Sequence, residues 1–378
     1  MKLSELLKIA VDNEAIDLFL MPKSPPMMRV KDDVIPVIGT HLTSFEIQQV
    51  VDFMTSDSQK AEFENTSELN FAYEREDIGR FRVNVFKSHS GLSVVFRIVK
   101  LEIPTIDELR LPHILQDIIM EERGLIFIVG AVGSGKSTTL AALLNYRNMH
   151  RNGHILTIED PLEFLHVHNR SIFSQREVGI DTESYESALK NVLRQSPDVI
   201  AVGEIRDIEA MNAALHYAET GHLMITTLHA VNSYQAFERM INFYPAEFRD
   251  NILLEISANI KAVVSQRLIP RADGTGRVVA VGVLRDSPRI RDLIAKGSIA
   301  EISAELEKRN TEGIVSLDEA IFKLHEEGLI TAEDGLRYAD RPNNMAIRIR
   351  QLENTLRQRQ EADKIRHPRD QAGRLTNL

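Results

Sequence analysis

The sequence predicts an α/β protein of two domains, a small α+β domain followed by a larger domain with a largely parallel sheet. Three observations lead to this prediction. The 378 residues exceed the length of one ordinary domain about twofold. Beyond the first third of the chain, short apolar runs alternate with helical stretches, as in parallel strands that are buried on both faces. A glycine-rich segment, residues 130–137, joins one such run to a helix rich in Ala and Leu.

Composition excludes several classes of protein. Hydrophobic residues make up 43% and charged residues 26% of the chain, as in a folded globular protein rather than a disordered or collagen-like one. Cysteine is absent, which rules out disulfides, a cysteine nucleophile and cysteine-based zinc or iron–sulfur sites. The net charge of −10 argues against a protein that coats nucleic acid. No run of about 18 apolar residues and no signal peptide is visible, so we expect a cytosolic protein without a transmembrane segment.

Residues 1–100 are predicted to form the small α+β domain. Its elements follow from helical spacing, from period-two alternation and from Pro or Gly breaks. They are a helix over 3–10, a strand over 17–20, a hairpin of 28–30 and 34–38, a helix capped by Ser44 that ends near Met54, and antiparallel strands over 80–86 and 92–98. The alternation places Arg80 and Arg82 on the face opposite the apolar one.

Residues 101–111 are predicted to be the linker to the larger domain, residues 112–340. The strands of this domain are the short apolar runs 125–129, 155–158, 199–202 and 223–227. Two further strands, 263–269 and 278–284, flank a glycine-containing turn, and only helices are expected after them.

Residues 341–378 form a basic tail of different composition. The tail carries nine Arg or Lys and four Asp or Glu, a net charge of +5, so that the rest of the chain carries −15. Ile349, Leu352 and Leu356 continue a helical stripe. Beyond about Gln360 large apolar residues are sparse, and we expect disorder there.

Residues 130–137 match the G-x-x-x-x-G-K-[ST] pattern of a phosphate loop. Glycines let backbone N–H groups close around phosphate oxygens, and the start of the following helix adds a favourable dipole. Lys136 is predicted to reach the β- and γ-phosphates of ATP, and the Ser137 hydroxyl to bind Mg²⁺. The order of strand, loop, lysine and helix favours this interpretation over a plain glycine-rich turn. The predicted nucleotide-binding residues are Gly130, Ala131, Val132, Gly133, Ser134, Gly135, Lys136, Ser137 and Thr138.

Two acidic residues follow buried strands of the same domain. Glu159 comes after residues 154–158, and Glu204 comes after residues 199–203. Ligands of open α/β sheets bind outside the carboxyl ends of the strands, so both carboxylates are predicted to face the triphosphate. Either can orient the attacking water or hold Mg²⁺ through water. Without the phosphate loop, both would be better interpreted as exposed acids at strand ends; the phosphate loop favours a catalytic role.

His222 and His229 flank the apolar run 223–227. Both are candidates for contacts with the γ-phosphate. A histidine beside an apolar strand is more often an ordinary structural residue, and the spacing alone leaves both interpretations open.

Four sequence boxes occur in a specific order. They are GxxxxGKS at 130–137, ILTIEDPLEF at 155–164, LRQSPDVIAVGEIRD at 193–207 and AETGHLMITTLHA at 218–230. Together they resemble the Walker A, Asp box, Walker B and His box of the secretion-type traffic ATPases. Over about residues 1–340 the chain is similar to the type IV pilus retraction ATPases, the PilT/PilU family. QREVG at 175–179, AD-x-x-N at 339–343 and the long basic tail resemble PilU more than PilT.

The resemblance implies a PAS-like N-terminal domain and a RecA-like P-loop ATPase domain with a helical C-terminal part. It implies Mg²⁺-dependent ATP hydrolysis by a homo-hexamer that powers pilus retraction and twitching motility. A PilU-type chain would be an accessory in a hetero-assembly with a PilT-type ATPase. The expected place is the cytoplasm, peripheral at the inner membrane at the pilus base, next to the inner-membrane platform protein and without nucleic acid.

Three arginines, Arg80, Arg82 and Arg97, match the family's N-terminal arginines that reach phosphates across a subunit interface. Ordinary solvated arginines are the alternative. The chain also departs from the family pattern in three places. Around residues 17–20 it has Ile16 and Phe19 and lacks the SDLH sequence that is usual in the family. Ala131-Val132 stands where Pro-Thr is common, and residues 287–294 differ from the AIRNLIRE helix that PilT needs for retraction.

Three alternative functions are weighed against the sequence. A pilus assembly or type II secretion ATPase typically carries a tetracysteine zinc element, which a chain without cysteine cannot form. A nucleic-acid translocase would need a basic stripe, and none is evident. A regulatory nucleotide-binding ring subunit with little turnover is disfavoured by the presence of Lys136, Glu159 and Glu204.

Overall fold

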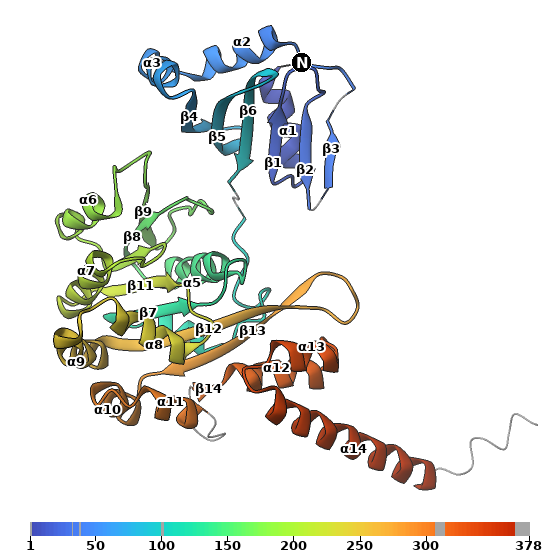
Figure 1. Ribbon diagram of the computed structural model, residues 1–378, viewed down its shortest axis with the longest axis vertical. Coiled ribbons are helices and arrows are strands. Elements are labelled where there is room, and N and C mark those ends of the chain that lie inside the picture. Colours follow the sequence, from blue (N-terminus) through green and yellow to red (C-terminus); the bar gives the residue numbers. More distant parts are fainter. Residues whose placement is uncertain (1, 32, 38, 100–101, 307–313, 367–378) are drawn as a thin grey trace, which may run out of the picture. The chain divides into compact units, whose positions relative to one another are not determined.

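The computed structural model describes residues 2–31, 33–37, 39–99, 102–306 and 314–366, with side chains as far as residue 358. The chain divides into two compact units, whose elements are labelled in Figure 1. Unit 1 contains residues 1–103 together with 159–167 and 175–184. Unit 2 contains residues 104–158, 168–174 and 185–378. Two short segments from near the middle of the chain, 159–167 and 175–184, thus belong to unit 1, which the sequence did not indicate.

Among the described residues of unit 1, six strands form an antiparallel sheet in the order β3-β2-β1-β6-β5-β4. The strands are β1 Asp17–Leu20, β2 Met27–Val30, β3 Asp33–Pro36, β4 Glu68–Arg75, β5 Gly79–Ser88 and β6 Gly91–Ile98. The helices are α1 Leu3–Asp12, α2 Ser44–Met54 and α3 Asp57–Thr66. Along β5 buried and less buried residues alternate, so Phe81 faces the core while Arg80 and Arg82 lie on the other face.

The helices of unit 1 differ in how well the sequence predicts them. Helix α2 has the expected bounds, but its N-cap is Thr43 and not Ser44. Thr43 Oγ1 accepts a hydrogen bond from the Glu46 amide at 3.2 Å, and the Thr43 amide donates to Glu46 Oε2 at 2.8 Å, which is a capping box. Helix α3 was not predicted because it has no buried residue and therefore no apolar stripe.

In the described part of unit 2, eight strands form a sheet in the order β14-β13-β12-β7-β11-β10-β8-β9. Strands β12, β7, β11, β10 and β8 run parallel, whereas β13 and β14 are antiparallel to their neighbours. The strands are β7 Gly124–Val129, β8 Gly153–Glu159, β9 Ser171–Glu177, β10 Val199–Val202, β11 Leu223–Leu228, β12 Ile260–Pro270, β13 Arg277–Arg285 and β14 Ile314–Val315.

Helices connect these strands and follow them. They are α4 Ile114–Ile119, α5 Lys136–His150, α6 Tyr185–Lys190, α7 Ile208–Glu219, α8 Ser233–Asn242, α9 Arg249–Asn259, α10 Pro288–Ala295, α11 Ile299–Leu306, α12 Leu317–Glu326, α13 Ala332–Tyr338 and α14 Pro342–Arg366, with short 3-10 turns η1 Val192–Gln195 and η2 Ala246–Phe248. None of the helices in the described ranges is both long and apolar enough to cross a bilayer.

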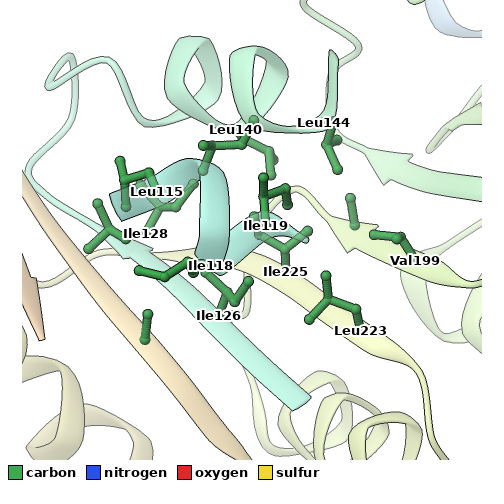
Figure 2. Packing of buried hydrophobic residues seen from close by; sticks show 14 of the residues in the cluster. Leu115, Ile118, Ile119, Ile126, Ile128, Leu140, Leu144, Val199, Leu223 and Ile225 are labelled. Carbon is green, nitrogen blue, oxygen red and sulfur yellow. The ribbon is translucent and has the colours of Figure 1, made fainter. Parts of the chain in front are cut away.

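The centre of the sheet forms the core of unit 2. All residues of β7 and β11 are buried, which is why these strands appear in the sequence as unbroken apolar runs. Figure 2 shows Ile126 of β7 and Ile225 of β11 packed with Ile118 and Ile119 of α4 and with Leu140 of α5. This packing fixes the start of α5 beside the end of β7.

The predicted linker, residues 101–111, is longer than the connection that the structure shows. The division between the units falls between residues 103 and 104. Ile106 and Leu111 are buried in the core of unit 2. Their segment has neither helical nor strand periodicity, and so the sequence pattern gave no sign of their burial.

The C-terminal helices pack on the hairpin of β12 and β13, as Figure 1 shows for α12 and α13. The short strand β14 corrects the expectation of helices only, since it pairs with Val283 and Leu284 of β13. Helix α14 continues to Arg366, past its expected end near Gln360, because residues 361–366 contain no helix breaker. The remainder of the tail that was expected to be disordered, residues 367–378, lies outside the described residues.

Candidate functional site

The phosphate-loop segment connects the end of β7 to the start of α5. Gly133 and Gly135 have φ of +75° and +87°, a region that other residues rarely adopt. A Cβ atom on Gly130 would lie 2.3 Å from Ser134 Oγ and 2.7 Å from the backbone oxygen of Gln266. The glycines of the motif are therefore required by the backbone path and by close packing, independently of any ligand.

Lys136 is the first residue of α5, and it is 9% exposed. Its ammonium group donates hydrogen bonds to the backbone oxygens of Gly130 at 3.0 Å and Ala131 at 3.1 Å. The lysine thus folds back over the loop, and its charge lies among backbone groups that surround the expected phosphate position. Val132, in the same loop, is by contrast 86% exposed.

Glu204 and His229 lie together at the carboxyl ends of β10 and β11. Glu204 Oε1 is 3.1 Å from His229 Nε2. His229 Nδ1 is 3.4 Å from Lys136 Nζ. The structure therefore joins three predicted site residues from three neighbouring strand ends into one connected group. Such a convergence is expected where parallel strands end at the same edge of a sheet.

One further contact holds the Glu204 carboxylate, and another holds the backbone next to Glu204. Arg206 Nε donates to Glu204 Oε2 at 3.0 Å. Thr227 Oγ1, on the neighbouring strand, donates to the backbone oxygen of Gly203 at 2.7 Å. One carboxylate oxygen is thus occupied by Arg206, and the other faces His229. The sequence reading did not single out Arg206 or Thr227, although both lie inside the quoted boxes.

The prediction that His222 contacts the γ-phosphate is wrong. His222 precedes β11, and its neighbour Leu223 pairs with Gly124, the first residue of β7. The phosphate loop begins at the opposite end of β7, roughly 20 Å away for a strand of this length. His222 Nδ1 instead lies 3.2 Å from the Tyr217 backbone oxygen. Two histidines that flank one strand necessarily lie at opposite edges of the sheet.

Glu159 ends β8 and belongs to unit 1. Its Oε1 accepts a hydrogen bond from Gln175 Nε2 at 3.3 Å, and its backbone oxygen accepts one from the Val178 amide at 2.9 Å. These contacts connect the segments 159–167 and 175–184 of unit 1. A role of Glu159 toward nucleotide stays a prediction.

The three arginines predicted to reach phosphate all belong to unit 1, where they lie on one face of its sheet and have acidic partners. Arg82 Nε is 3.0 Å from Glu177 Oε1, and Arg80 Nη2 is 3.7 Å from Glu177 Oε2. Arg97, directly opposite Arg82 on the neighbouring strand, donates to Asp17 Oδ1 at 2.9 Å. Their roles toward phosphate stay predictions.

Glu177 is the acid that pairs with Arg80 and Arg82. It is 2% exposed, and burial raises the pKa of its carboxyl group, while the two arginines act to lower it. Sequence reasoning did not find this residue. The one feature of the sequence that could have indicated Glu177 is its position in the QREVG segment, residues 175–179. That segment was used only to distinguish PilU from PilT.

Comparisons with known proteins identify the family of this chain. A family described as "Type II/IV secretion system protein" matches residues 41–359. The chain belongs to this family. It is 43% identical to "Type IV pilus ATPase PilU" of Pseudomonas aeruginosa over 93% of this chain and 92% of that protein. It is 37% identical to the PilT retraction ATPase of the same organism over 91% of this chain and 100% of that protein.

Solved structures give the same result for this secretion ATPase. The pilus retraction motor PilT with bound ADP matches with a TM-score of 0.84 at 33% identity, covering 91% of this chain and 98% of that chain. The ATPase DotB of Legionella pneumophila matches with a TM-score of 0.75 at 25% identity, over 88% and 93% of the two chains. The chain is therefore an ATPase of the PilT/PilU type with an α/β fold, which confirms the resemblance drawn from the four sequence boxes.

Proposed function

We propose that this chain is an ATP-driven motor of type IV pilus retraction. The main observation in support is that Lys136, His229 and Glu204 form a contiguous group beside a phosphate loop. The distance is 3.4 Å between Lys136 and His229 and 3.1 Å between His229 and Glu204. A positive charge at the phosphates and a held carboxylate at the strand ends are the parts that ATP hydrolysis needs. The ADP-bound relative PilT supports nucleotide as the ligand.

In this mechanism each side chain has a defined task. Lys136 contacts the β- and γ-phosphates and offsets the charge that develops there in the transition state. Glu204 orients the attacking water, and Arg206 holds that carboxylate through its other oxygen. His229 lies between Glu204 and Lys136, where it can contact the γ-phosphate. Glu159 is proposed to complete the site, and Arg80, Arg82 and Arg97 are proposed to act on the nucleotide of a neighbouring subunit.

The oxygen donors of the site fit Mg²⁺, which prefers hydroxyl, carboxylate and phosphate oxygens. The Ser137 hydroxyl lies in the first turn of α5, next to Lys136, and would bind the ion directly. Glu204 would hold it through water. The bound ion would neutralise phosphate charge during hydrolysis.

We further propose the finer assignments that the family resemblance suggests. Residues 1–100 would be PAS-like, and residues 112–340 would be a RecA-like ATPase domain in a homo-hexamer. The identity to PilU, higher than to PilT of the same organism, supports a PilU-type accessory that acts with a PilT-type ATPase. Its place would be the cytoplasmic side of the pilus base, against the inner-membrane platform protein.

Motility of a deletion strain tests this function. The strain is complemented with the wild-type chain, with Glu204→Ala, or with Glu209→Ala as a matched control, since Glu209 is an exposed acid in the first turn of α7. Wild type and the control are expected to restore twitching and pilus length, and Glu204→Ala is expected to fail. Full rescue by Glu204→Ala would contradict the proposal.

A further inference from the structure

Gln266 is a buried polar residue on β12, next to the phosphate loop. Gln266 is only 1% exposed. Strand β12 pairs in parallel with β7, and Ser265 lies opposite Val129, the last residue of β7. Gln266 therefore reaches the level of Gly130, where the phosphate loop begins.

The side chain of Gln266 holds the far side of that loop. Its Nε2 donates a hydrogen bond of 2.7 Å to the backbone oxygen of Ser134. The phosphate loop and Gln266 also approach each other closely on both sides of this hydrogen bond. A Cβ atom on Gly135 would lie 3.3 Å from Gln266 Nε2, and one on Gly130 would lie 2.7 Å from the Gln266 backbone oxygen. The loop and β12 thus fit together through two glycines.

The bond has a directional consequence for the loop. The carbonyl of Ser134 and the N–H of Gly135 belong to one planar trans peptide, and in such a peptide these two groups point in opposite directions. Because the Ser134 oxygen is turned toward Gln266, the Gly135 N–H is turned away from β12. A backbone N–H before Lys136, at the start of α5, is a donor that a phosphate can use.

We propose that Gln266 is a positioning residue for the nucleotide phosphate, acting through the Ser134–Gly135 peptide. This inference rests on the proposed function, because it requires nucleotide at the phosphate loop. Gln266 itself does not touch the phosphate. Its amide keeps one loop N–H oriented toward the anion before the nucleotide arrives, which lowers the cost of ordering the loop on binding.

Two variants of similar shape test the proposal in the full-length protein. Gln266→Met keeps the length of the side chain without a donor. Gln266→Glu keeps the shape but offers only acceptors to the Ser134 oxygen and adds a negative charge near the phosphate. Ser265→Ala is the control, because Ser265 is a neighbour on the same strand that is also buried, at 3% exposure, with its side chain on the other face.

The readouts are the dissociation constant of ADP by calorimetry, the melting temperature, and kcat and KM for ATP. We expect Gln266→Met to weaken ADP binding about tenfold, the loss of one buried hydrogen bond. We expect Gln266→Glu to weaken it about a hundredfold or more. KM should rise with the ADP constant while kcat changes less, because the phosphate is positioned in the ground state as well. Ser265→Ala should bind ADP like wild type.

The outcomes separate this inference from the proposed function. If wild type does not bind ADP, both fail. If wild type binds ADP and Lys136→Ala does not, the proposed function stands. If Gln266→Met then binds ADP within twofold of wild type and differs only in a lower melting temperature, Gln266 is structural and the inference fails. Failure of both Gln266 variants to fold, with Ser265→Ala folded, would also overturn the inference, because Gln266 would then be a determinant of the fold.

Discussion

At the scale of single residues, the chemistry of the site depends on contacts between side chains that are remote in sequence. The Glu204–His229 contact spans 25 positions, and the Gln266–Ser134 bond spans 132. The sequence located the first pair because both residues follow apolar strands. It missed Gln266, since a lone amide in an apolar strand has no motif and its partner is a backbone oxygen.

His166 makes folding stability depend on pH. Burial lowers the pKa of His166 to about 4, from an ordinary value of 6.5. The unfolded chain therefore takes up a proton below pH 6.5 that the folded chain takes up only near pH 4, so stability should fall as the pH is lowered through this window. Because the residue is partly exposed, we expect about 1 kcal/mol between pH 7.5 and 5.

Urea unfolding at pH 7.5 and pH 5 measures this contribution. The variant His166→Gln should lose about 1 kcal/mol of the pH dependence that wild type shows. His168→Gln is the matched control, because it removes an exposed histidine only two residues away. Equal pH dependence in wild type and His166→Gln would contradict the role of burial.

At the scale of elements, Asp340 connects the C-terminal helices to the loop that follows His229. Arg267 of β12 contacts Asp340 Oδ1 at 3.0 Å and donates to the Val231 backbone oxygen at 3.3 Å. Asn232, the N-cap of α8, donates to Asp340 Oδ2 at 3.1 Å. The junction of α13 and α14 is thereby tied to the segment that carries His229.

We expect Asp340→Ala to lower kcat severalfold with a smaller effect on ADP binding, because the His229 segment loses its support. The melting temperature should fall by about 2–4 °C. Asp273→Ala is the control, since it removes another Asp–Arg pair, Arg271 with Asp273 at 2.7 Å, in the β12–β13 turn. Steady-state kinetics compares them, and equal kcat in the two variants would refute the coupling.

The elements themselves were predicted unevenly. The buried parallel strands of unit 2 were found because burial on both faces produces unbroken apolar runs, as in β7 and β11. Helix α3 and strand β14 were missed, the first because it buries nothing and the second because it has only two residues. The assignment of residues 175–184 to unit 1 depends on contacts such as Arg82 with Glu177, which no local pattern encodes.

At the scale of the whole molecule, the proposed hexamer makes a prediction about Arg82. In this proposal Arg82 acts on nucleotide held by a neighbouring subunit, as trans-acting arginines do in other nucleotide hydrolases. Within one chain Arg82 is paired with the buried Glu177 at 3.0 Å, so reaching a neighbour's phosphate requires this pair to open or to be shared.

Mixing two inactive variants tests action in trans. Arg82→Ala and Lys136→Ala should each lack ATPase activity, and mixed rings should regain part of it, because some interfaces combine an intact loop with an intact arginine. Phosphate release is measured after verified subunit exchange, with each variant alone as the control. Activity that stays at zero in mixed rings would show that Arg82 does not act across the interface.

The central claim is that Lys136 binds the phosphates while Glu204 acts on the chemistry. Its most direct test is the parallel measurement of nucleotide binding and phosphate release for wild type, Lys136→Ala and Glu204→Gln, with exposed Lys296→Ala as the control. Lys136→Ala should lose both binding and turnover. Glu204→Gln should bind ATP within a few-fold of wild type and hydrolyse it about 10²–10³-fold more slowly. Loss of binding in Glu204→Gln, or near-normal turnover in either variant, would contradict the account.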